Sequence, residues 1–290
     1  MNSTTRDTPW QRAACLLHFA CRDDDPSRSG IPLSRDNFDW RQMSPATTPP
    51  LLAFIHGGSH HAGCWDDAIA ALRLTCPTIH IMTVSMPGRL DEPGDLATLT
   101  IEQCVAACCE QIARARREGE DVVLVGHSLA GVLMPGLARR LEAGSVRRAI
   151  FVACCVPPPG HCVVDTLPTG LHWLVRRIVR RTPVIEAVPW VVLRFFFGNG
   201  TTRSQRDRIR AVTCAESSAL LVETPTATWP ESIAVTWILP TRDRAQPAFT
   251  QRRSMAALGG VTDVRTIDAS HDVMITAPAE LARALLDVIS

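Results

Sequence analysis

Short apolar runs recur along the chain from residue 51 onward. Each run has four to eight residues, is rich in Val and Ile, and is bounded by Gly, Pro or polar residues. Continuous runs of this length are typical of strands that are buried on both faces of a parallel sheet. The expected strands are 51–55, 79–84, 122–125, 149–154, 233–239 and 264–267.

Helical periodicity fills the intervals between these runs. Apolar residues repeat at helical spacing over 101–117, 129–143 and 278–289, and the last segment has Pro278 in its first turn. Strands that alternate with helices predict a doubly wound α/β fold with a mostly parallel sheet.

Two segments depart from this alternation. Residues 1–48 are polar and punctuated by proline, which predicts an irregular N-terminal extension. Residues 157–230 have helical pattern but no clear core strand, so we expect a helical cap inserted into the sheet domain. The core domain would then consist of 49–156 and 231–290.

Composition excludes several classes of function. The 290 residues include 30 basic and 29 acidic side chains, and the net charge of +1 provides no overall field for binding nucleic acid. The sequence contains neither Lys nor Tyr, so every basic residue is Arg. Schiff-base lysines, P-loop lysines and Tyr-Lys oxidoreductase sites are therefore excluded.

The 11 cysteines form no C-x-x-C pair, which argues against zinc ribbons and thioredoxin-type sites. Cys104 and Cys108 lie one turn apart on an expected helix, as two small apolar residues on a buried face would. We interpret the cysteines as reduced thiols. Separately, no motif in the sequence indicates a cofactor, and none is expected.

No segment is expected to export the chain or to anchor it in a membrane. The apolar stretch 15–20 is short and leads directly into three Asp residues. The stretch 184–197 is interrupted by Glu186, Pro189 and Arg194, and is shorter than the roughly 20 residues of a membrane span. These features predict a soluble, cytoplasmic protein, either a monomer or a homodimer, that contacts no membrane.

The sequence GHSLAG at 126–131 follows an expected strand and opens an expected helix. In this context a Ser between small residues predicts a tight strand-to-helix turn that exposes a nucleophile, here Ser128. The departure from G-x-S-x-G at Ala130 is one that such a turn should tolerate.

A serine nucleophile needs a base and an acid, each placed at the end of a later strand. His271 follows the last strand and is the only histidine after His172, so it is the expected base. Asp243 follows the preceding strand and is the expected acid. Asp268 and Asp272 are also near His271, but neighbours on one loop rarely reach behind the ring.

An oxyanion hole requires backbone N–H groups that point at the developing negative charge. Leu129 would supply one at a helix N-terminus, and Gly58 would supply the other from the loop after the first strand. His56, His60 and His61 in this loop lack a carboxylate or cysteine cluster to complete a ligand set, so no metal is expected.

These motifs resemble the α/β-hydrolase superfamily over residues 50–290. The similarity is carried by HGGSHHAGCW at 56–65, GHSLAG, TRDRAQP at 241–247 and SHDVM at 270–274, and the first and third look like the methylesterase and hydroxynitrile-lyase branch. The resemblance implies a serine hydrolase with Ser128, Asp243 and His271 as its triad. It also implies Gly58 and Leu129 as oxyanion donors and a helical cap.

The resemblance also argues against one activity. The related hydroxynitrile lyases look to use a Lys beside the catalytic His and a Thr after the His of the loop. This sequence has Asp272 and Gly57 at those positions and no Lys at all, so cyanohydrin cleavage by that mechanism is not expected.

The inserted segment suggests two substrate features. Its aromatic residues form either an apolar ceiling over the substrate or the core of the cap itself, and the expected pocket residues are His127, Trp173, Trp190 and Phe196. A helix over 171–181 carries Arg176, Arg177, Arg180 and Arg181 on one face. This face is either solvated or a docking site for an acidic carrier protein or CoA.

The leading hypothesis is hydrolysis of an apolar small-molecule ester, thioester or lactone through an acyl-enzyme. A C–C hydrolase, or a tailoring thioesterase or cyclase, would use the same triad. A non-catalytic receptor on this fold would not need the triad.

Overall fold

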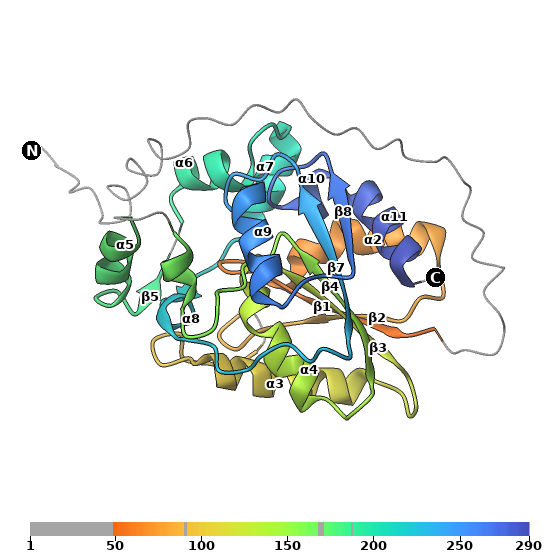
Figure 1. The fold of residues 1–290 in the computed structure, drawn as a ribbon. Coiled ribbons are helices and arrows are strands. Elements are labelled where there is room, and N and C mark those ends of the chain that lie inside the picture. Colours follow the sequence, from red (N-terminus) through yellow and green to blue (C-terminus); the bar gives the residue numbers. More distant parts are fainter. Residues whose placement is uncertain (1–48, 90–91, 168–170, 187, 290) are drawn as a thin grey trace, which may run out of the picture.

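The computed structural model describes residues 49–89, 92–167, 171–186 and 188–289, so the expected extension at 1–48 lies outside the described residues. Six parallel strands form the main sheet in the order β2-β1-β3-β4-β7-β8 (Figure 1). The predicted fold class is confirmed. The strands are β1 (Leu51–Ile55), β2 (Ile81–Val84), β3 (Val122–His127), β4 (Val146–Val152), β7 (Ala234–Pro240) and β8 (Asp263–Ile267).

All six predicted strands are present, but several begin or end a few residues away from the ends of the apolar runs. All residues of β1 and β3 are buried, which explains why these strands have no polar face. The sequence placed the fourth strand at 149–154, whereas β4 starts at Val146. Its first residues include the exposed Arg147, which an apolar run cannot reveal.

Helices cover both faces of the sheet. Alternate side chains of β1 point to opposite faces, so Leu52 and Phe54 belong to one apolar core and Ala53 and Ile55 to another. The first core includes α2 (Asp66–Thr75) and α11 (Pro278–Ile289), and the second includes α3 (Ile101–Ala115), α4 (Met134–Arg140) and α9 (Ala248–Ala257). In Figure 1, α2 and α11 lie above β1 and β2, at the upper right, and α3 and α4 lie below the sheet.

The single helix expected over 129–143 is interrupted. A 3₁₀ turn, η3 (Ser128–Val132), precedes α4, which starts at Met134. Pro135 lies in the first turn of α4, where its missing N–H costs no hydrogen bond. The same residue inside a continuous helix would remove one, so the helix begins at this position instead.

The segment 157–230 contributes no strand to the main sheet, but it contains a small sheet that the sequence did not predict. The two-residue strands β5 (Val184–Ile185) and β6 (Glu216–Ser217) pair antiparallel. Short helices make up much of the rest: η4 (Val163–Thr166), α5 (Leu171–Val179), α6 (Trp190–Val192), η5 (Leu193–Phe197), α7 (Arg203–Ala211) and α8 (Ala219–Val222). The proposed domain boundaries stay predictions.

The cysteines among the described residues are all free thiols. Cys104 and Cys108 are buried on α3, as their spacing predicts, and burial raises the pKa of Cys104 to about 12. None of the helices in the described part of the chain is both long and apolar enough to cross a membrane.

Leucine-to-alanine changes should separate the buried sheet from the surface. Leu124 at the centre of β3 is 0% exposed, so Leu124→Ala should lower the free energy of unfolding by about 2–5 kcal/mol. Leu74 on α2 is 87% exposed, so Leu74→Ala should change it by less than about 0.5 kcal/mol. Urea unfolding followed by circular dichroism measures both, and equal effects would contradict the assignment of β3 to the core.

Candidate active site

Ser128 lies at the turn between β3 and η3, with a backbone φ of +51°. This left-handed conformation is costly for a residue with a side chain, and it places Ser128 at the sharp turn that its neighbours predict. Small residues make room for the turn. A Cβ at Gly126 would meet Met134 Sδ at 2.8 Å and Ala130 Cβ at 3.3 Å.

The structure brings Ser128, His271 and Asp243 together from the ends of three strands. His271 Nε2 lies 2.9 Å from Ser128 Oγ, and His271 Nδ1 lies 2.8 Å from Asp243 Oδ2. Asp243 is further held by the Gln246 backbone N–H at 2.8 Å and by Gln251 Nε2 at 3.2 Å. A carboxylate, an imidazole and a hydroxyl in this order can move a proton off the hydroxyl.

The other carboxylates near His271 are occupied elsewhere. Asp268 is largely exposed and forms an ion pair with Arg242 at 2.8 Å. Asp272 is buried and lies 3.3 Å from His60. Asp243 is therefore the carboxylate that bonds the His271 ring.

The charged form of His271 is favoured by its surroundings. Burial of the ring opposes protonation, but the charge and hydrogen bond of Asp243, together with the charge of Asp272, outweigh it and raise the pKa of His271 above 6.5. Such a ring readily accepts a proton from a hydroxyl.

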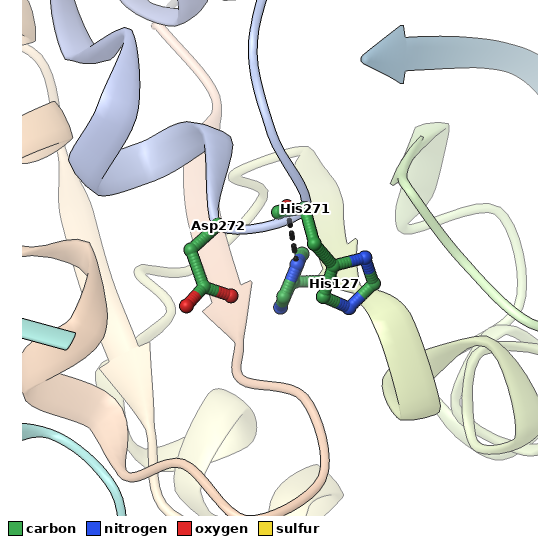
Figure 2. Close-up of side chains that lie close together, drawn as sticks. All are labelled: His127, His271 and Asp272. Atoms are coloured by element: carbon green, nitrogen blue, oxygen red, sulfur yellow. Dashed lines mark hydrogen bonds between the residues drawn. The ribbon is translucent and has the colours of Figure 1, made fainter. Parts of the chain in front are cut away.

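His127 packs against His271 and is completely buried. Its ring centroid lies 4.8 Å from that of His271, and its Nε2 lies 3.1 Å from the His271 carbonyl oxygen (Figure 2). Burial, followed by the charge of His271, lowers the pKa of His127 well below 6.5. The neutral ring therefore donates from Nε2 and holds the backbone of His271.

The expected oxyanion residues are neighbours in space. A Cβ at Gly58 would meet Leu129 Cδ2 at 2.9 Å, and a Cβ at Gly57 would meet Ser128 Cβ at 2.9 Å. The first loop thus packs directly against the nucleophile turn, and only glycine allows this approach.

The aromatic residues expected to line a pocket are spread over the inserted segment. Trp173 is 63% exposed, Trp190 stacks with Arg210, and Phe196 is buried against Phe195. No contact brings these three rings to Ser128, Asp243 or His271 in the described part of the chain. The neighbouring Phe197 does so, with its ring centroid 5.0 Å from that of His271.

The expected four-arginine face is reduced to three residues. Arg176 bonds Asp165 and Cys162 Sγ, whereas Arg177, Arg180 and Arg181 are exposed. Residue spacing places all four on one helix face but cannot show that one of them has a partner.

The side chains of His127, His271 and Asp272 have donor atoms within 4.8 Å of one another (Figure 2), a spacing that suits a metal ion. Both ring nitrogens of His271 already bond Ser128 and Asp243, and Asp272 bonds His60. A metal at this point would have to break the Ser128–His271–Asp243 chain, so the donor set does not fit a resident ion.

A surface groove of about 1070 Å³ lies elsewhere, with Pro157, Trp229 and Gly259 in its lining. The lining includes none of the three hydrogen-bonded side chains. We therefore do not assign this groove to the chemistry at Ser128.

The buried neutral histidines should make the fold acid-sensitive. Burial lowers the pKa of His56 to about 3 and that of His127 well below 6.5, whereas both rings take up protons below about pH 6.5 once unfolded. The unfolded chain then binds more protons. The free energy of unfolding should fall by about 1 kcal/mol for each pH unit between about 6.5 and 5 through His56 alone, and His127 should act in the same direction.

The raised pKa values of His60 and His271 do not oppose this slope. Their stabilising contribution is fully present below about pH 6.5 and is lost only as pH rises through the folded-state values. Urea unfolding at several pH values measures the slope. A free energy of unfolding that stays constant over this range would contradict the burial of neutral rings.

Comparison with known proteins places these features in a family. The model of the "Alpha/beta hydrolase family" matches residues 52–284. The probable esterase PIR7A of Oryza sativa subsp. japonica is 35% identical over 120 residues, or 40% of this chain and 43% of that protein. The carbendazim hydrolyzing esterase of Nocardioides sp. (strain SG-4G) is 33% identical over 122 residues, or 41% of this chain and 48% of that protein. The matched parts thus span less than half of each relative.

Solved structures share the fold at low sequence identity. An extracellular alpha/beta-hydrolase from a Paenibacillus species has a TM-score of 0.70 at 20% identity, covering 82% of this chain and 98% of that chain. Polyneuridine aldehyde esterase has a TM-score of 0.67 at 18% identity, covering 84% and 100%.

Proposed function

Because the chain belongs to the alpha/beta hydrolase family, we propose that it is a serine hydrolase that cleaves a carboxylic ester through an acyl-enzyme. The observation that carries this proposal is the hydrogen-bonded chain of Ser128, His271 and Asp243. Two of its relatives are named as esterases, which supports ester hydrolysis over other reactions of this fold.

In the first half of the reaction, Ser128 Oγ attacks the ester carbonyl carbon while His271 Nε2 takes the hydroxyl proton. The carbonyl oxygen becomes an oxyanion, and the N–H groups of Gly58 and Leu129 stabilise it. His271 then gives the proton to the leaving alcohol as the C–O bond breaks. Asp243 holds the imidazole in the required tautomer and balances its positive charge.

In the second half, His271 takes a proton from water as the water oxygen attacks the acyl group. The tetrahedral intermediate collapses, Ser128 recovers the proton from His271, and the carboxylic acid leaves. The same steps cleave a thioester or a lactone.

An apolar substrate is favoured by what faces the base. The Phe197 ring packs edge-on against the His271 ring. The apolar residue Leu129 comes directly after Ser128 in the sequence. We propose that the 157–230 segment acts as the cap and that its η5 turn supplies the apolar wall. A C–C hydrolase and a tailoring thioesterase or cyclase would use the same triad, whereas a receptor would not need it, and fluorophosphonate labelling distinguishes the receptor from the enzymes.

We also propose that the basic surface of the inserted segment binds a partner. Arg177, Arg180 and Arg181 are exposed, and this concentration of positive charge suits an acidic carrier protein or the phosphates of CoA. Arg176 is not included, because it already pairs with Asp165.

A fluorophosphonate probe should label the protein at one residue. The probe traps an activated serine, so peptide mapping should find the adduct on Ser128 and nowhere else. Ser128→Ala should abolish labelling and lower the hydrolysis of p-nitrophenyl esters by several powers of ten. Ser254→Ala is the matched control, since this buried serine lies on α9 and bonds the Val156 backbone. A folded protein that is not labelled would exclude the esterase and favour the receptor.

The rate should depend on the protonation of His271. Only the neutral ring can take the proton of Ser128, so kcat/KM should rise with pH and level off above an inflection that lies above pH 6.5. Asp243→Asn should lower the plateau by roughly 10³- to 10⁴-fold and move the inflection to lower pH, because it removes the charge that raises the pKa. An inflection that Asp243→Asn leaves in place would show that another group controls the rate.

A further inference from the structure

The loop that carries Gly58 is held by the C-terminal part of the inserted segment. The Cys214 N–H donates to the Ser59 carbonyl at 3.0 Å, and the His61 N–H donates to the Val212 carbonyl at 3.2 Å. His60 and Thr213 form an isolated bridge between the same two stretches. Loop 57–61 and residues 211–217 thus form one unit.

Within this unit, the Gly58–Ser59 peptide group is held at both ends by charged side chains. Its carbonyl oxygen lies 2.8 Å from His60 Nδ1, and its N–H donates to Glu216 Oε2 at 2.9 Å. Ser59 has a φ of +55°, a conformation that a serine adopts only where its surroundings enforce it.

Each of these side chains has a buried partner of opposite charge. His60 Nε2 lies 3.3 Å from Asp272 Oδ2, so both ring nitrogens face acceptors, an arrangement that favours the protonated ring. Arg89 bonds the other oxygen of Glu216, and both side chains are almost completely buried. Arg89 follows β2 and Glu216 lies in β6, and among the described residues no hydrogen bond or ion pair joins either side chain to Ser128.

The preceding peptide group, Gly57–Gly58, is fixed from one side only. Its carbonyl accepts a hydrogen bond from His56 Nδ1 at 2.9 Å. Because the carbonyl and the N–H of a trans peptide point in opposite directions, the Gly58 N–H faces away from His56. Among the described residues, this N–H has no hydrogen-bond partner in the protein.

We propose that the Arg89–Glu216 and His60–Asp272 pairs are positioning elements that clamp the Gly58–Ser59 peptide and thereby hold the Gly58 N–H on the substrate oxyanion. The Ser59 N–H is occupied by Glu216, which leaves the Gly58 N–H as the donor from this loop. The inference rests on the proposed function, since it assigns Gly58 to the oxyanion hole of that reaction.

Two buried ion pairs are not needed to hold a loop in place. Burying charges costs solvation free energy, and apolar side chains of similar volume usually stabilise a fold at least as well. Charged groups do supply strong hydrogen bonds of fixed direction, which an oxyanion donor requires. We therefore attribute the placement of both ion pairs on one peptide group to the alignment of the Gly58 N–H with the substrate oxyanion.

The test compares an ester with its thionoester, in which sulfur replaces the carbonyl oxygen. Sulfur accepts hydrogen bonds poorly, so a working oxyanion hole makes the ester react much faster. In Glu216→Gln, the lost charge frees Arg89 and loosens the Ser59 N–H. We expect kcat for the ester to fall roughly tenfold to hundredfold with KM changed less than about twofold, and the ester-to-thionoester rate ratio to fall roughly tenfold.

Glu120→Gln is the matched control. Glu120 is also almost completely buried and bonds a histidine, His80, at 2.7 Å, but it lies far from the loop in the fold, before β3. The control should keep the wild-type ratio. The ratio is measured on active molecules only, so a lower folded fraction in Glu216→Gln does not alter it.

The outcomes separate the two levels of the proposal. If the wild-type protein hydrolyses the ester and Glu216→Gln keeps the wild-type ratio, the clamp is wrong even if that variant is slower or less stable. If the ester-to-thionoester rate ratio of the wild-type protein is no larger than that of the uncatalysed hydrolysis in water, the oxyanion role of Gly58 is wrong. The proposed clamp is then wrong as well. If the wild type neither hydrolyses the ester nor reacts with the fluorophosphonate, the proposed function itself is wrong.

Discussion

The left-handed turn at Ser128 is the constraint on which the rest of the site depends. It requires a buried strand before it, a helical turn after it and small residues around it, and β3, η3, Gly126 and Ala130 meet these needs. Gly57 also packs so closely against this turn that a Cβ at position 57 would lie 2.9 Å from Ser128 Cβ. A side chain at either of these glycines would push the first loop or α4 away from Ser128.

A dense set of buried polar groups surrounds this turn, and nearly all of their charges are balanced locally. His271 pairs with Asp243, His60 with Asp272 and Arg89 with Glu216, while His56 and His127 stay neutral because burial lowers their pKa values. Each pair holds a different part of the site: the ring of His271, the carbonyl of Gly58 and the N–H of Ser59. The cost of desolvating these groups is offset by the hydrogen bonds that they give to the backbone.

The sequence predicted those features that rest on local patterns. Apolar runs located every strand of the main sheet, and the positions of Ser128, Asp243 and His271 just after three of these strands brought them to one edge. The break before α4 could have been read from Pro135, because proline belongs in the first turn of a helix.

Features that depend on tertiary contacts could not be predicted in this way. Arg89 and Glu216 are 127 residues apart, and neither lies in a periodic pattern or a motif. Phe197 rather than Phe196 lies against His271, and both belong to η5, a π-helical turn whose orientation relative to His271 depends on tertiary contacts. Arg176 looked free because its partner, Asp165, precedes the helix.

A crystal structure of the phosphonylated enzyme would test the central claim most directly, because the phosphonyl oxygen occupies the place of the substrate oxyanion. We predict an adduct on Ser128 whose oxygen lies about 2.7–3.1 Å from the backbone nitrogens of both Gly58 and Leu129, with the Ser59 N–H still bonded to Glu216. An adduct oxygen that points to solvent, or that bonds Ser59 after its N–H has left Glu216, would contradict the account.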